Sequence, residues 1–125
     1  MPLVQLEFVK GRLPCGKKLV FDAIHEALVE ALKIPDSHRH QRLIEHEAED
    51  FDTPSPNYTM VTITMYPGRS LAAKRNLYRG IVDKLGELGI AGSDINIVVI
   101  EPPLDNWGSG GIPASERDLG VDLNV

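Results

Sequence analysis

The segment VQLEFVKGR at residues 4–12 returns later in the chain as VTITMYPGR at residues 61–69. Both copies are rich in apolar and β-branched residues, and both end in a glycine–arginine pair. A run of this kind closed by glycine is typical of a buried strand that ends in a turn. The repetition indicates that the chain carries two copies of one structural unit.

A helix is predicted after each glycine–arginine pair. Apolar residues recur at helical spacing from Leu19 to Leu32 in the first half and from Leu77 to Leu88 in the second. Pro14 suits the opening turn of the first helix, and Ser70 is a candidate N-cap of the second.

Each predicted helix leads through a short turn to a further strand, over residues 39–46 in the first half and 95–101 in the second. Each half is therefore a β-α-β unit. Two such units side by side predict an α+β fold, in which a four-stranded sheet carries both helices on one face.

A single domain is expected over residues 1–125, since a chain of this length normally forms one. The first repeat spans about 2–50, the second about 58–103, and a proline-rich connector at 52–57 joins them. Residues 104–125 form a C-terminal arm of the kind that commonly reaches a neighbouring subunit. Within this arm we expect a glycine-rich turn or hairpin at 106–111 and a short terminal strand at 121–125.

The composition narrows the class of protein. A net charge of −5 argues against a nucleic-acid or membrane-surface partner. The sequence has neither signal-peptide features nor an apolar run of membrane-spanning length, so a cytoplasmic location is predicted. Cys15 is the one cysteine and cannot form an internal disulfide.

Pro2 is chemically distinctive because it follows the initiator Met1. Removal of Met1 would leave proline with a free secondary amine, whereas with Met1 retained its nitrogen is an amide without basicity. An α-amino group ordinarily has a pKa of about 7.7–8.0, close enough to neutrality for proton transfer. The strand predicted directly after Pro2 would hold the amine in place. Pro2 is therefore a candidate general base.

Three histidines, His38, His40 and His46, raise the question of a metal site. Alternate residues of a strand face opposite sides of a sheet, and no further cysteine or histidine completes a four-ligand set. We predict neither a metal nor another cofactor.

Taken together, these features resemble the tautomerase superfamily, whose founding member is 4-oxalocrotonate tautomerase. The resemblance rests on Pro2 before the first strand, the two glycine–arginine pairs, the duplicated β-α-β pattern and the segment WGSGG at 107–111. The turn at 35–39 and the segment at 49–51 look most like the branch that contains malonate semialdehyde decarboxylase. The resemblance implies a homotrimer of fused repeats.

Site residues follow from the same resemblance. Only the first repeat carries the proline, because Thr59 or Met60 occupies the matching position of the second, so one site per chain is expected. Arg69 is the arginine expected near Pro2, while Arg12 has a structural or interface role. Arginine is suited to binding a carboxylate because its planar guanidinium can donate two parallel hydrogen bonds to the two carboxylate oxygens.

Three further residues are implied to bind substrate. His38 and Arg39 lie at the turn where related enzymes place polar active-site residues, although an exposed turn histidine is the alternative. Trp107 either walls the pocket or packs a trimer interface. The decarboxylase has an aspartate where His38 aligns and an arginine where Pro67 aligns, and the histidine and glutamate of the dehalogenase branch are not evident, so dehalogenation is not predicted.

The leading hypothesis is a cofactor-independent keto–enol tautomerase of a small 2-oxo or enol acid, with Pro2 as general base and acid and Arg69 as carboxylate or enolate binder. One alternative is a decarboxylase or hydratase of a small β-oxo acid, in which a protonated Pro2 polarises the carbonyl. A second is a non-catalytic trimeric ligand-binding protein, because a fold does not by itself establish a function.

Overall fold

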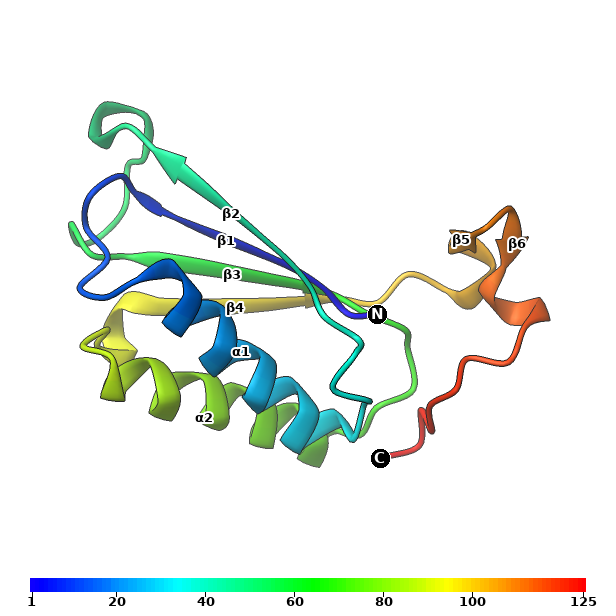
Figure 1. Ribbon diagram of the computed structural model, residues 1–125. Helices are drawn as coiled ribbons and strands as arrows, with labels where there is room; N and C mark the ends of the chain where they lie inside the picture. Colours follow the sequence, from blue (N-terminus) through cyan, green and yellow to red (C-terminus); the bar gives the residue numbers. More distant parts are fainter.

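A computed structural model describes residues 1–125 and contains the two predicted β-α-β units (Figure 1). In chain order the elements are β1 (Leu3–Val9), α1 (Lys17–Leu32), β2 (His40–His46), β3 (Thr59–Thr64), α2 (Leu71–Glu87) and β4 (Ile95–Ile100). Both helices lie on one face of a four-stranded sheet, which confirms the predicted α+β fold.

The strand order β2-β1-β3-β4 places the two units edge to edge. Within each unit the two strands are parallel, whereas the central strands β1 and β3 are antiparallel, with Leu3 opposite Thr64. The start of β1 therefore lies beside the end of β3. This register brings the residue before β1, Pro2, close to the turn that contains Arg69.

The core fills the space between the sheet and the helices. Alternate residues of β1 and β3 point into it, because successive strand residues face opposite sides of a sheet. The helices contribute one apolar face each. The largest fully buried side chains include Leu6, Ile63, Ile24, Leu28, Leu77 and Ile81.

The other face of the sheet carries no helix. Ile44, Val98 and Ile100 are exposed there, at 38%, 49% and 46% of their surface.

No helix of the chain is long and apolar enough to cross a membrane.

Several predicted boundaries need correction. Helix α1 begins at Lys17 with Gly16 as its N-cap, so Pro14 lies before the helix. Strand β2 begins at His40 rather than Arg39, and β4 ends at Ile100 rather than Glu101.

The arm contains one of its two predicted elements. A short hairpin forms from β5 (Gly108–Ser109) and β6 (Ile112–Pro113), as expected. The strand predicted at residues 121–125 is wrong, because that segment has no neighbouring strand with which to form a ladder.

Candidate active site

Pro2 is buried directly before β1, at one end of an inner strand of the sheet. Strand β1 is paired on both edges, so this terminus is held rather than frayed. The preceding Met1 is half-buried and packs against the cluster of Tyr66, Trp107 and Ala114. Burial first, and the positive charge of Arg69 second, lower the pKa of the terminal amine below its ordinary value.

Arg69 lies in the turn between β3 and α2 and is only 6% exposed. Its Nη1 donates a hydrogen bond to the backbone oxygen of Tyr66 at 3.2 Å. The remaining two nitrogens, Nε and Nη2, are buried and have no partner. Burial lowers the pKa of the guanidinium, and the charges of Glu101 and Asp122 oppose that effect. A buried cation with two unused donors is suited to binding an anion.

An aromatic pair borders this region. The rings of Tyr66 and Trp107 meet edge to face, with centroids 4.9 Å apart and planes at 72°. The indole Nε1 of Trp107 donates to the backbone oxygen of Pro102 at 3.1 Å, which fixes the ring. Trp107 is 9% exposed within this one chain, so its ring is largely buried in the apolar cluster that also contacts Met1.

A cavity of about 230 Å³ opens beside the amino terminus. Its lining comes from four separate parts of the chain: Met1, His38, His40, Tyr66, Ser109, Arg117, Asp118 and Leu119. Of these residues, the sequence analysis selects His38 as a substrate-binding candidate and considers His40 only as a metal ligand. Tyr66 belongs to the repeated strand segment, and Arg117 lies in the arm with no motif to single it out.

His38 is placed at this cavity, and its Nδ1 is buried without a hydrogen-bond partner. Burial lowers the pKa of His38, and the positive charges of the amino terminus and His40 lower it further. A neutral imidazole is therefore favoured at pH 7.

The turn that carries His38 is anchored by a buried histidine of α1 that sequence reasoning did not select. His25 is 2% exposed, and its Nε2 lies 2.8 Å from the backbone oxygen of Asp36 and 3.2 Å from that residue's Oδ1. A carbonyl oxygen only accepts hydrogen bonds, so Nε2 carries the hydrogen.

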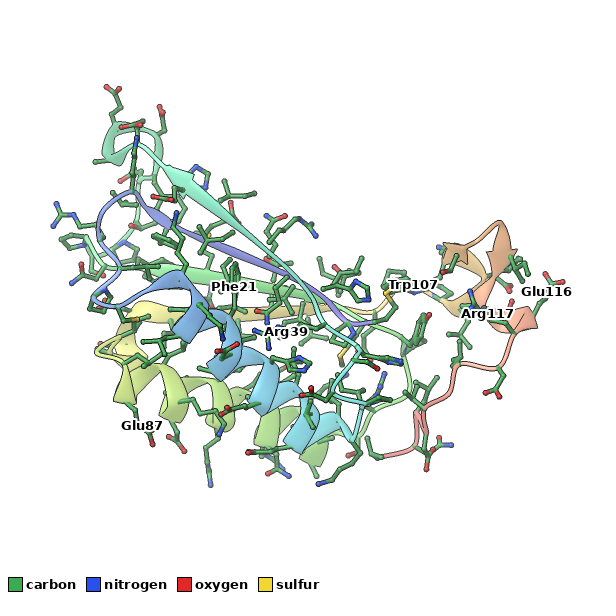
Figure 2. All side chains as sticks on the ribbon, viewed as in Figure 1. Phe21, Arg39, Glu87, Trp107, Glu116 and Arg117 are labelled. Atoms are coloured by element: carbon green, nitrogen blue, oxygen red, sulfur yellow. The ribbon has the colours of Figure 1, made fainter.

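Arg39 is directed elsewhere. Its Nη2 donates to the carboxylate of Asp22 on α1, and Arg39 does not line the cavity. Hydrogen bonds from Lys18 and then Arg39 lower the pKa of Asp22. Figure 2 places Arg39 over α1, and Trp107 and Arg117 toward the arm.

The opposite end of the sheet holds the position that matches Pro2 in the second repeat. Thr59 is buried there and donates its hydroxyl hydrogen to the backbone oxygen of Asn57 at 3.3 Å. Arg12 is exposed at this end and lines a cavity of about 50 Å³ with Thr59. It also lines the largest cavity, of about 520 Å³, with Glu49 and Asp52 among others. Neither cavity contains a terminal amine.

No group of three or more histidine, cysteine, aspartate or glutamate side chains is arranged to hold a metal ion.

The features near Pro2 are a rigid terminus, a buried arginine with free donors, an aromatic wall and a small cavity. This arrangement suits proton transfer on a small carboxylate.

Comparison with known proteins finds two family models, both described as tautomerase enzymes, that match residues 2–52 and 38–110. The chain is 28% identical to the probable tautomerase YrdN of Bacillus subtilis (strain 168), over 88% of this chain and 92% of that protein. It is 27% identical to FG41 malonate semialdehyde decarboxylase in a crystal structure inhibited by 3-bromopropiolate, with a TM-score of 0.77 over 90% of this chain and 92% of that chain. A symmetric trimer of Q0 fused 4-OT, at 22% identity, shares the fold with a TM-score of 0.79 over 92% of this chain and 99% of that chain.

Proposed function

Because the chain belongs to the tautomerase enzyme family, we propose that it is a cofactor-independent keto–enol tautomerase of a small 2-oxo or enol acid. The observation that carries this proposal is the buried guanidinium of Arg69, which has two unpartnered nitrogens and lies near enough to the amino terminus to lower the pKa of its amine.

Pro2 is the general base and acid of the proposed reaction once Met1 has been removed. Its neutral secondary amine takes a proton from C3 of a 2-oxo acid, and the electron pair of the C–H bond forms the C2–C3 double bond while the carbonyl becomes an enolate. The protonated amine then gives that proton to the enolate oxygen, which yields the enol and restores the neutral amine. The reverse sequence converts an enol acid to its keto form.

Arg69 binds the substrate carboxylate or the developing enolate oxygen. Its free Nε and Nη2 supply two donors in the fixed geometry of the guanidinium. In a buried site such a charge acts strongly on the transition state, because little water screens it. The same charge adds to burial in favouring the neutral amine.

The other site residues complete the proposed pocket. His38 presents its unpartnered Nδ1 to the substrate, and Trp107 contributes to the apolar wall through its contact with Tyr66, which lines the cavity. Arg39 supports the pocket from outside the cavity, since its ion pair with Asp22 ties the His38 turn to α1.

The test combines intact mass with ketonisation of phenylenolpyruvate. The wild-type protein should lack Met1 and turn over this enol acid. Pro2→Ala and Arg69→Ala should each lower kcat/KM by roughly 10²-fold or more, because general base catalysis and an oxyanion donor each contribute on that scale. Arg12→Ala is the matched control, since it removes the corresponding arginine of the other repeat.

The control should keep its wild-type kcat/KM. If the processed wild type has no turnover that depends on Pro2, the tautomerase proposal fails. If kcat/KM instead falls equally in Arg12→Ala and Arg69→Ala, the proposal that the site lies at the end of the sheet that holds Arg69 is wrong.

A second candidate is a decarboxylase or hydratase of a small β-oxo acid. It is favoured by the 27% identity to FG41 malonate semialdehyde decarboxylase over nearly the whole of both chains. Here a protonated Pro2 would polarise the β-carbonyl while the C–C bond to the carboxylate breaks and CO₂ leaves. Release of CO₂ from malonate semialdehyde that depends on Pro2, without turnover of phenylenolpyruvate, would favour this reaction.

We also propose that the protein is a homotrimer. The uncovered sheet face exposes Ile44, Val98 and Ile100, and association would remove this apolar surface from water. The likeness to the fused 4-OT trimer supports the same arrangement. A non-catalytic trimer remains the alternative, and retention of ligand binding without Pro2-dependent turnover would identify it.

A further inference from the structure

The last five residues, Val121–Val125, form a segment without helix or strand that we call the tail. Val121, Leu123 and Val125 are half-buried, whereas Asp122 and Asn124 are exposed. The carboxylate Oδ1 of Asp122 accepts a hydrogen bond from the backbone N–H of Asn124 at 2.9 Å, which shapes the tail locally.

The tail docks on the turn that carries Arg69. On one side of Arg69, the backbone N–H of Ser70 donates to the backbone oxygen of Val125 at 2.8 Å. On the other side, Gly68 has a φ of +118° and lies against Leu123, so that a Cβ atom at Gly68 would be 3.4 Å from the Cβ of Leu123. Both neighbours of Arg69 in the sequence therefore contact the tail.

Leu123 also links this turn to the aromatic wall. It packs against the cluster of Tyr66, Trp107 and Ala114. Tyr66 in turn accepts the hydrogen bond from Nη1 of Arg69 through its backbone oxygen. The side chain of Leu123 thus contacts both Gly68, directly before Arg69, and the aromatic cluster that contains Tyr66.

We propose that the tail is a positioning element that holds Arg69 so that its two unpartnered nitrogens face the substrate carboxylate. This inference rests on the proposed function of the site. Without the tail, the turn at 67–70 loses a backbone hydrogen bond and an apolar contact, and the guanidinium has a wider range of positions. The negative charge of Asp122, a residue of the tail, acts to raise the pKa of Arg69 and so favours the charged guanidinium.

The test compares Leu123→Ala with Leu123→Met and with Leu104→Ala. Leu104 is the matched control, because it packs against the same aromatic cluster, whereas the atoms nearest to a Cβ at Gly68 all belong to Leu123. Hydrogen exchange at the Ser70 amide and at Nε–H of Arg69 in ¹⁵N-labelled protein reports docking of the tail without any need for turnover. Titration with pyruvate, followed at Nε–H of Arg69, reports carboxylate binding.

Leu123→Ala should speed both exchange rates and weaken pyruvate binding by about tenfold, the effect of losing one charge-assisted hydrogen bond. The KM for phenylenolpyruvate should rise more than kcat falls. Leu123→Met should restore these values, and Leu104→Ala should leave them unchanged even though it lowers stability.

Exchange at Ser70 and Arg69 that is unaltered in Leu123→Ala, or altered equally in Leu104→Ala, would overturn the positioning role. Absence of any shift at Nε–H of Arg69 with pyruvate in the wild type would also overturn it. If pyruvate binding depends on Leu123 but phenylenolpyruvate is not turned over, the positioning role stands and the tautomerase proposal fails.

Discussion

Arg69 acts on the amine beside it, and in the proposed function it also binds the carboxylate. Its positive charge adds to burial in lowering the pKa of the terminal amine, because a protonated amine near a second cation is unfavourable. Once Met1 is removed, we expect the same two causes to act on the nitrogen of Pro2, which is buried directly before β1.

The pH dependence of the reaction follows from this charge. In wild-type protein kcat/KM should rise with pH as the amine loses its proton. In Arg69→Gln one cause of the lowered amine pKa is gone, so the midpoint of the pH profile of kcat/KM should move to higher pH. Less of the amine is then neutral at pH 7. Arg69→Lys keeps the positive charge, so this midpoint should stay near the wild-type value. KM should rise, because the lysine ammonium lacks the planar guanidinium that donates two parallel hydrogen bonds to a carboxylate. A midpoint for Arg69→Gln at or below that of wild type would contradict this account.

At the scale of elements, the two helices begin with different caps. The Ser70 Oγ accepts a hydrogen bond from the Ala73 backbone N–H at 3.0 Å at the start of α2, whereas Gly16 of α1 makes no side-chain cap. The backbone of Gly16 is extended, and a Cβ atom there would meet nothing within 4 Å. A side chain that caps the helix therefore fits at Gly16.

Opposite changes at the two caps should have opposite effects on the free energy of unfolding. Ser70→Ala should lower it by ~1 kcal/mol through loss of the cap, and Gly16→Ser should raise it by a few tenths of a kcal/mol, since glycine is itself a fair cap. Urea unfolding at one fixed protein concentration measures both, because oligomers gain stability with concentration. A stabilised Ser70→Ala would show that this hydrogen bond contributes nothing to α2.

At the scale of the whole molecule, the sheet has one covered and one uncovered face. The helices bury the inner face, and the apolar residues of the outer face, Val98 among them, are left exposed in a single chain. Burial of such surface is the main favourable term in most association between proteins. The homotrimer proposal therefore predicts that association depends on this face and not on the helices.

Val98→Asp should dissociate the trimer, because it would bury an unpaired carboxylate at the interface. Leu19→Asp is the matched control: Leu19 lies on α1 and is 52% exposed, close to the 49% of Val98. Sedimentation equilibrium should give a monomer mass for Val98→Asp and a trimer mass for Leu19→Asp and wild type. A wild-type monomer would remove the proposal outright.

The fold was accessible from local sequence patterns. Strand alternation, helical spacing and the repeated glycine–arginine pairs predicted both β-α-β units, and the structure confirms them. The position of Arg69 near Pro2 was implied by the family resemblance, and the antiparallel register of β1 and β3 accounts for it. The roles of these two residues and the cytoplasmic location stay predictions.

Other features depended on contacts between residues far apart in the chain. The spacing of residues does not reveal that Arg39 pairs with Asp22, that Arg117 lines the cavity, or that alternation at 121–125 produces a docked tail rather than a strand. A periodic pattern reports which side of an element is apolar, and local propensity reports which element forms. The partner that each side chain meets depends on how the elements pack, so only the folded chain defines it.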